Sequence, residues 1–253
     1  MNFKVSVVIP TLNRPEMLKK CVESLSGQAN IHELLVIEDD PKNPLGCEQV
    51  RQKGVMQTSK ESTHIYFTDD DCIVEEGCLE RLCDPTIWNS GKVGATGGAC
   101  VRMNEPHFYQ KIWQYQVEPM TIDNDGRICD LSAYYVRDSK WYLADHLRGG
   151  NMLVSKQAFL EVGGMSKEFG AGTMRGETDL CLKMRELGYK LYFNGSARVL
   201  HYKKTYTISN IEKSSDEFWR KKWKPKKFLG HVRPVNFAPT IAVDLHILND
   251  PLG

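Results

Sequence analysis

Three consecutive acidic residues, Asp69, Asp70 and Asp71, follow the apolar run Thr63 to Thr68 in a chain of 253 residues. Carboxylates crowded at the end of an apolar strand repel one another unless a cation or hydrogen bonds compensate their charge. Asp69 and Asp71 project to one side of an extended backbone, so one can bind a divalent metal while the other faces a sugar or ribose. Taken alone, the triplet is equally typical of a solvated acidic loop or a helix cap.

A second acidic pair, Glu38 and Asp39, follows the apolar run Leu34 to Ile37, which is predicted to be a buried strand. In open α/β sheets, ligands bind outside the carboxyl ends of the strands. The two acidic sets therefore predict one site at that edge of a sheet.

The elements that must position these acids are predicted from the spacing of apolar residues. The run Val5 to Pro10 predicts a buried parallel strand, and Pro15 is suited to open a helix that continues to Leu25. Further strands are predicted at 63–68, 93–101, 152–154, 189–193 and 197–201, and helices at 47–58, 156–162 and 179–187. This order predicts an α/β fold with a mostly parallel central sheet flanked by helices.

Composition narrows the classes of protein. Lys and Arg number 33 against 32 Asp and Glu, so net charge gives no argument for nucleic acid. No apolar stretch approaches the roughly 20 residues of a membrane span, and the start lacks a signal-peptide pattern, which predicts a cytoplasmic protein. The 8 cysteines are spread along the chain and predict buried thiols. The first predicted turn, Pro10 to Pro15, lacks the glycines of nucleotidyltransferases, P-loop enzymes and dinucleotide oxidoreductases.

The order and spacing of these motifs over roughly residues 4–205 resemble the inverting family 2 glycosyltransferases of GT-A fold. The run Val7 to Arg14 is similar to that family's first strand and nucleotide-binding loop, and Glu38-Asp39 to its paired acid. Asp69-Asp70-Asp71 occupies the place of the DXD motif, and Arg175 to Leu180 is similar to the segment that supplies the catalytic base. The resemblance implies a GT-A nucleotide-binding domain.

The resemblance also implies the role of each site residue. Glu177 is the expected base and Asp179 the second candidate, because Thr178 separates two acids that are adjacent in many members. Asp71 is the expected metal ligand, together with His201. The expected nucleotide-sugar contacts are Pro10, Thr11, Asn13, Arg14, Asp39, Asp69, Asp70, Arg148, Gly150 and Asn151. The alternatives are helix stabilisation for the two acids, a structural role for His201 and a plain turn for Arg148.

By the same resemblance the chain is an inverting glycosyltransferase that moves a sugar from a nucleoside-diphosphate sugar to an acceptor hydroxyl, with Mn²⁺ or Mg²⁺ as cofactor. Asp39 would accept a hydrogen bond from an imide N–H, which favours UDP or dTDP and leaves GDP open. The expected acceptor is a glycan, a lipid-linked sugar or a small molecule, and no nucleic acid is expected. The alternative is a non-catalytic sugar-nucleotide-binding regulator or partner subunit.

Residues 206–253 form a predicted extension, packed on or flanking the domain of residues 1–205. The segment Phe218 to Leu229 is basic with interleaved aromatic residues. We favour a solvated surface segment; the alternatives are an interfacial anchor for anionic lipid and part of a site for a phosphate-bearing acceptor. The lipid anchor would place the cytoplasmic protein at the inner face of a membrane.

Overall fold

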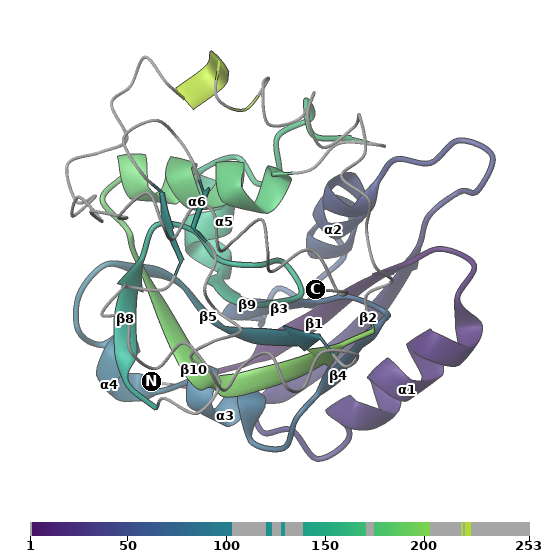
Figure 1. The fold of residues 1–253 in the computed structure, drawn as a ribbon, viewed down its shortest axis with the longest axis horizontal. Helices are drawn as coiled ribbons and strands as arrows, with labels where there is room; N and C mark the ends of the chain where they lie inside the picture. Colours follow the sequence, from purple (N-terminus) through teal and green to yellow (C-terminus); the bar gives the residue numbers. More distant parts are fainter. Residues whose placement is uncertain are drawn as a thin grey trace, which may run out of the picture.

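The run Val5–Thr11 forms the strand β1 of a computed structural model, within a central sheet (Figure 1). Its side chains alternate between the two faces of that sheet. Val8 belongs to one hydrophobic cluster, whereas Val7 and Ile9 belong to another. The structure describes residues 2–102, 120–122, 128–129, 139–170, 175–202, 219 and 221–223.

The central sheet is 8-stranded, in the order β2-β1-β3-β9-β5-β10-β4, with β8 also paired to β10. Its other strands are β2 (Ile31–Glu38), β3 (His64–Thr68), β4 (Cys72–Val74), β5 (Val93–Arg102), β8 (Trp141–Ala144), β9 (Asn151–Ser155) and β10 (Lys190–His201). The strands β1, β2, β3, β5 and β10 run in one direction and β4, β8 and β9 in the other. The prediction of a mostly parallel sheet is confirmed. A separate small sheet pairs β6 (Thr121–Ile122) with β7 (Ile128–Cys129).

Helices cover both faces of the central sheet (Figure 1). They are α1 (Pro15–Leu25), α2 (Cys47–Val55), α3 (Cys78–Leu82), α4 (Pro85–Trp88), α5 (Lys156–Glu161) and α6 (Gly176–Glu186). Side chains of α2, α5 and α6 pack in the cluster that contains Val8, and side chains of α1, α3 and α4 pack in the cluster that contains Val7. The molecule therefore has three layers, with the sheet in the middle.

Two predicted elements differ from the structure. The strand β2 lies at the edge of the sheet, and only its Ile37 is buried, so the prediction of a buried strand there was wrong. Apolar runs cannot by themselves distinguish an edge strand from a central one. The two short strands predicted at 189–193 and 197–201 are one strand, β10, whose register against β5 shifts between Asn194 and Arg198.

The described part of the C-terminal extension packs against the protein. Trp219 and Trp223 are 1% and 4% exposed, and they form a hydrophobic cluster with Phe169, Ile122 and Leu182 of α6. The prediction of a solvated surface segment is therefore wrong for these two residues, because their indole rings cover an apolar surface beside α6. The remainder of residues 206–253 lies outside the described residues.

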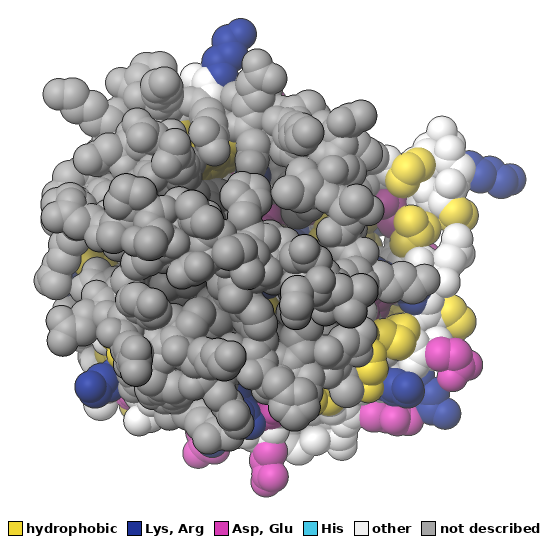
Figure 2. Space-filling model, in the orientation of Figure 1, with side chains coloured by type: hydrophobic (Ala, Val, Ile, Leu, Met, Phe, Trp, Pro, Cys, Tyr) yellow, Lys and Arg dark blue, Asp and Glu magenta, His cyan; other side chains and the backbone are white. Residues whose placement is uncertain are grey.

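Other predictions concern the surface and the thiols. Figure 2 shows acidic and basic side chains beside one another where described residues are visible at the rim of this face. Within the described residues, no helix has both the length and the apolar character needed to cross a bilayer. Cys21, Cys72, Cys78, Cys83, Cys100 and Cys181 are buried, as predicted, whereas Cys47 is exposed, so the prediction was wrong for Cys47.

Candidate active site

A cavity of about 550 Å³ opens at the carboxyl ends of the parallel strands. Thr11 ends β1, Asp39 and Asp69 directly follow β2 and β3, and His201 ends β10. The cavity is lined by all four of these residues and by Pro10, Arg14, Asp71, Arg148, Gly150 and Glu177 among the predicted site residues. The sheet thus brings together residues that lie far apart in the sequence, at the edge where α/β proteins bind ligands.

The three aspartates of the triplet have three different surroundings. Asp70 is fully buried and accepts a hydrogen bond of 2.7 Å from Thr11 Oγ1, while its other oxygen lies 2.6 Å from Arg14 Nη2. Asp69 pairs with Arg51 at 2.5 Å. Asp71 lies between Arg14 Nη1 at 2.9 Å and His201 Nε2 at 3.0 Å. Asp70 therefore stabilises the loop after β1, and Asp69 and Asp71 face the cavity.

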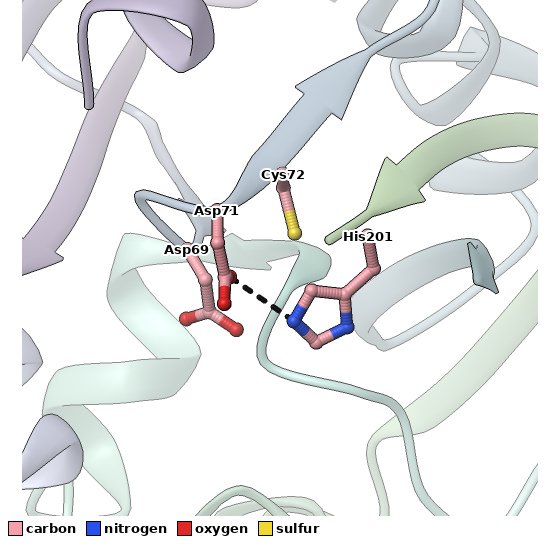
Figure 3. A group of neighbouring side chains, drawn as sticks. All are labelled: Asp69, Asp71, Cys72 and His201. Carbon is pink, nitrogen blue, oxygen red and sulfur yellow. Dashed lines mark ion pairs between the residues drawn. The ribbon is translucent and has the colours of Figure 1, made fainter. Parts of the chain in front are cut away.

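Asp71 and His201 can hold a divalent metal together. One ligand atom each from Asp69, Asp71, Cys72 and His201 lie within 4.8 Å of one another (Figure 3). Carboxylate oxygen and imidazole nitrogen are suitable ligands for Mn²⁺. The Cys72 thiol fits less well, because burial and the nearby Asp69 raise its pKa well above the ordinary value, so it stays protonated. The donor set therefore fits the predicted cation.

Charges around Asp71 keep it ionised. Burial alone would raise the pKa of Asp71, but the hydrogen bond and charge of His201 and the charge of Arg14 hold this pKa below the ordinary value. For Asp70, burial prevails over the hydrogen bond from Thr11 and the charge of Arg14, and the pKa is raised. Of the two carboxyl groups, Asp71 is the one that is held ionised and that also lines the cavity.

The carboxylate of Asp39 organises the loop that follows β2. Its Oδ1 accepts hydrogen bonds from the backbone N–H groups of Asp40 and Leu45, and its Oδ2 accepts one from Gly46. A carboxylate offers about four acceptor positions. One position of Oδ2 therefore remains for a ligand N–H, in a residue that is buried but lines the cavity.

The two acids at the start of α6 point to different surroundings. Glu177 lines the cavity, and the helix begins directly after Arg175, whose φ of +81° is a left-handed conformation rare in a residue with a side chain. Asp179 is fully buried. It bonds Ser166 Oγ, Trp223 Nε1 at 2.9 Å and Lys222 Nζ at 2.8 Å. Asp179 therefore joins α6 to the C-terminal extension.

Glu177 is hydrogen-bonded to a second carboxyl group, that of Glu48 in the first turn of α2. Burial and the charge of Glu177 raise the pKa of Glu48 to about 8. Burial also tends to raise the pKa of Glu177, but the hydrogen bond from Glu48 and the charge of Arg51 hold it below the ordinary value. At neutral pH the pair holds one proton, with Glu48 as the donor and Glu177 as the acceptor.

Four predicted site residues do not line the cavity: Asn13, Asp70, Asn151 and Asp179. Asn13 is exposed in the loop after β1. Asn151 is fully buried and bridges strands, since its amide nitrogen bonds the carbonyls of Ala99 and Ala197 and its oxygen accepts from Tyr66. The two glycines before Asn151 allow side chains of the cavity to lie close to the backbone. A side chain at Gly150 would meet Asp69 at 3.1 Å, and one at Gly149 would meet Arg51 at 2.4 Å.

Sequence reasoning missed Glu48 and Arg51, which line the cavity from α2. Both are buried, with exposed fractions of 7% and 3%. The sequence did contain a pattern that could have identified Arg51. It shares the inward helix face of Val50, Gly54 and Val55, where a charged residue needs a buried partner.

Two solved glycosyltransferase structures resemble this fold. The crystal structure of GalNAc-T7 with UDP, GalNAc and Mn²⁺ matches 85% of this chain at a TM-score of 0.64 and 15% sequence identity. The catalytic domain of Drosophila beta1,4-galactosyltransferase 7, in complex with xylobiose, matches 85% of this chain at a TM-score of 0.53 and 15% identity. This chain covers 47% of the first and 79% of the second.

These matches establish the fold. At 15% sequence identity they do not by themselves establish the function. The chain has the GT-A fold predicted from its motifs. No protein-family model matches the sequence, and no curated protein matches it significantly.

Proposed function

We propose that this protein is a metal-dependent glycosyltransferase that uses a nucleoside-diphosphate sugar as donor. One observation carries the proposal: two candidate metal ligands, Asp71 and His201, and a candidate base, Glu177, line the same cavity at the carboxyl ends of the strands. The two solved structures of the same fold support it, since one contains UDP and Mn²⁺. Membership of family 2, with its inverting mechanism, stays part of the proposal.

The donor would bind between the loop after β1 and the acidic turn after β3. Asp71 and His201 would hold Mn²⁺ or Mg²⁺, which neutralises charge on the leaving diphosphate. Arg14, whose side chain is 48% exposed, can reach a phosphate. The remaining acceptor position of Asp39 Oδ2 suits the imide N–H of uracil or thymine, which favours UDP or dTDP over GDP.

Glu177 would act as the base. Its carboxylate takes the proton of an acceptor hydroxyl as that oxygen forms a bond to the anomeric carbon, while the bond to the nucleoside diphosphate breaks. A single displacement of this kind inverts the anomeric configuration. We propose a glycan, a lipid-linked sugar or a small molecule as acceptor. A membrane contact would need residues other than Trp219 and Trp223, which are buried.

The test is calorimetric titration of UDP, dTDP and GDP with and without Mn²⁺, followed by measurement of nucleotide release from the matching sugar nucleotides. We expect metal-dependent binding of one nucleotide, loss of that binding in Asp71→Ala, and slow release of nucleoside diphosphate from one donor. Glu61→Ala is the control, because Glu61 is an acid that pairs with Lys4 away from the cavity. If a nucleotide binds but no sugar nucleotide releases its nucleoside diphosphate, the result would favour a non-catalytic regulator. If the folded protein binds none of the three nucleotides, the result would refute the proposed donor site.

A further inference from the structure

We propose that Glu48 is a positioning residue for the base: its carboxyl group donates a hydrogen bond to Glu177 and, with Arg51, connects the base to Asp69. This inference rests on the proposed function. It adds a residue that the resemblance to known transferases did not indicate, on a helix that the motifs do not include.

The first observation is the contact between the two helices. Glu48 lies in the first turn of α2 and is 7% exposed, and Glu177 lies in the first turn of α6. A Cβ atom at Gly176 would lie 2.1 Å from Glu48 Cγ. The glycine before the base therefore makes room for Glu48, and the two carboxyl groups can meet.

The second observation is the row of charges that continues from this pair. Arg51 Nη1 lies 3.8 Å from Glu48 Oε1, and Arg51 Nη2 lies 2.5 Å from Asp69 Oδ1. Arg51 is almost fully buried. Its guanidinium thus stands between Glu48, on the side of the base, and Asp69, on the side of the expected metal and donor.

The third observation is that the charges of the group do not balance unless one carboxyl group holds a proton. The groups that face Glu48 are Glu177 of α6, Arg51 and Cys47 of α2, and Asp69 after β3, with Arg175 beside Glu177. The three carboxylates and the guanidinium groups of Arg51 and Arg175 would leave one uncompensated negative charge, which one proton removes. The raised pKa of Glu48, about 8, places the proton on Glu48.

A protonated Glu48 performs two tasks for the base. Its O–H fixes the orientation of the Glu177 carboxylate, and the hydrogen bond stabilises the ionised form of Glu177, which is the form that can accept a proton. After the acceptor hydroxyl has been deprotonated, the pair holds two protons. Glu177 then returns one proton to water before the next turnover, which restores the pair with a single proton on Glu48.

Kinetics of two Glu48 variants test this role. In Glu48→Gln the amide still donates to Glu177, so we expect kcat at pH 7 within about threefold of wild type and loss of any pH dependence centred near 8. In Glu48→Ala the donor is gone, and we expect kcat to fall by about 10- to 100-fold while the donor KM changes by less than about twofold. Glu161→Gln is the matched control, because Glu161 bonds Tyr189 and does not line the cavity.

A wild-type kcat and pH profile in Glu48→Ala would overturn the proposal. So would an equal loss in the Gln and Ala variants together with weakened nucleotide binding, which would indicate a merely structural residue. Rescue by Gln relative to Ala, at unchanged nucleotide affinity, supports positioning.

An experiment without turnover separates this proposal from the proposed function. In protein labelled with ¹³C at the glutamate carboxyl carbons, we expect one carboxyl signal that titrates near pH 8 and disappears in both Glu48→Gln and Glu177→Gln. Absence of that signal in wild type refutes the proton-sharing pair, whether or not the protein is an enzyme. If the signal is present in a protein that releases no nucleotide from any donor, the proton-sharing pair would stand and the proposed transferase function would be refuted.

Discussion

Glu177 and Asp179 are two residues apart on α6, yet only Glu177 has the surroundings of a base. Glu177 lines the cavity and is held ionised by Glu48 and Arg51. Asp179 is fully buried and is occupied by Ser166, Lys222 and Trp223. Successive acids of a helix face different directions, because each residue turns by roughly 100°.

We therefore expect substitution of Glu177 to reduce activity and substitution of Asp179 to reduce stability. Glu177→Gln should lower kcat by about 10²- to 10⁴-fold and leave nucleotide binding intact, because the amide cannot take the acceptor proton. Asp179→Asn should retain kcat within a few-fold and lower the free energy of unfolding by about 2 kcal/mol, less than for a fully buried ion pair because Lys222 is partly exposed. Steady-state kinetics and urea unfolding of both variants check this. Loss of kcat in Asp179→Asn at wild-type stability would contradict the assignment.

His64 predicts a pH dependence of stability that is unrelated to the site. It is 3% exposed in β3, with Trp88 4.4 Å from its ring, and burial lowers its pKa from 6.5 to about 4. Between these two values the unfolded chain binds a proton that the folded chain does not, so stability falls as the pH falls from 6.5 towards 4. We expect His64 to account for about 2 kcal/mol of lost stability at pH 5 relative to pH 7.5.

Urea unfolding of His64→Leu at both pH values measures this contribution. The difference in unfolding free energy between pH 7.5 and pH 5 should shrink by about 2 kcal/mol in this variant. An unchanged difference in His64→Leu would mean that His64 is not the titrating group.

Single residues were predictable where their motif is local. Asp71, Glu177 and His201 lie in short runs next to apolar segments, and the structure places all three in the cavity. Asn151 and Asp70 stand in the same runs but turn inward and bond backbone or loop groups. Which of two neighbouring polar residues faces a cavity depends on the packing of other strands, which a local pattern does not contain.

At the scale of elements, β5 and β10 approach each other closely enough to restrict the side chains between them. A Cβ atom at Gly98 would lie 1.9 Å from the carbonyl oxygen of Ala197 and 2.5 Å from Asn151 Nδ2. Gly98 therefore allows the backbones of β5 and β10 to approach each other closely at this position. The shift in register of β10 lies at the same place, between Asn194 and Arg198.

Gly98→Ala should therefore destabilise the protein. Neither the backbone carbonyl nor the bonded amide can move away cheaply, and we expect a loss of about 3 kcal/mol in unfolding free energy. Gly170→Ala is the control, since its Cβ would make an ordinary contact at 3.4 Å. Thermal and urea unfolding measure both, and wild-type stability of Gly98→Ala would show that β5 and β10 can separate more easily than their packing indicates.

Helices and strands were predicted well where the spacing of apolar residues is regular, and poorly where a strand forms only because a neighbouring strand pairs with it. The strands β1, β3, β5 and β9 and the helix α1 lie close to their predicted positions. The helix α6 begins at Gly176, three residues before the predicted start, because polar residues of its first turn hide the helical pattern. The short strands β4 and β8 were missed, since they exist through their pairing with β10.

At the scale of the whole molecule, the cavity exists only when the sheet is assembled. Its lining comes from β1, from the loops after β2 and β3, from the segment before β9, from the starts of α2 and α6, and from β5 and the end of β10. The motifs predicted most of these contributions, because they include a recognisable acid, arginine or histidine. The contribution of α2 was missed, since Glu48 and Arg51 acquire their role only when α6 packs beside them.

A site built from so many elements should couple ligand binding to global stability. A ligand that binds only the folded chain stabilises it by about 2.7 kcal/mol when its concentration is 100 times its Kd. For a chain of 253 residues this is a rise in Tm of roughly 5 to 10 °C. We expect UDP and Mn²⁺ together to produce this rise in a thermal shift assay and either one alone to produce much less, because Asp71 and His201 would hold a cation that also binds the diphosphate. The rise should disappear in Asp71→Ala and persist in Asp179→Asn, measured from that variant's own lower Tm. An equal rise with UDP alone, or in Asp71→Ala, would show that the nucleotide binds without the cation, and the metal site would then have to be separated from the donor site.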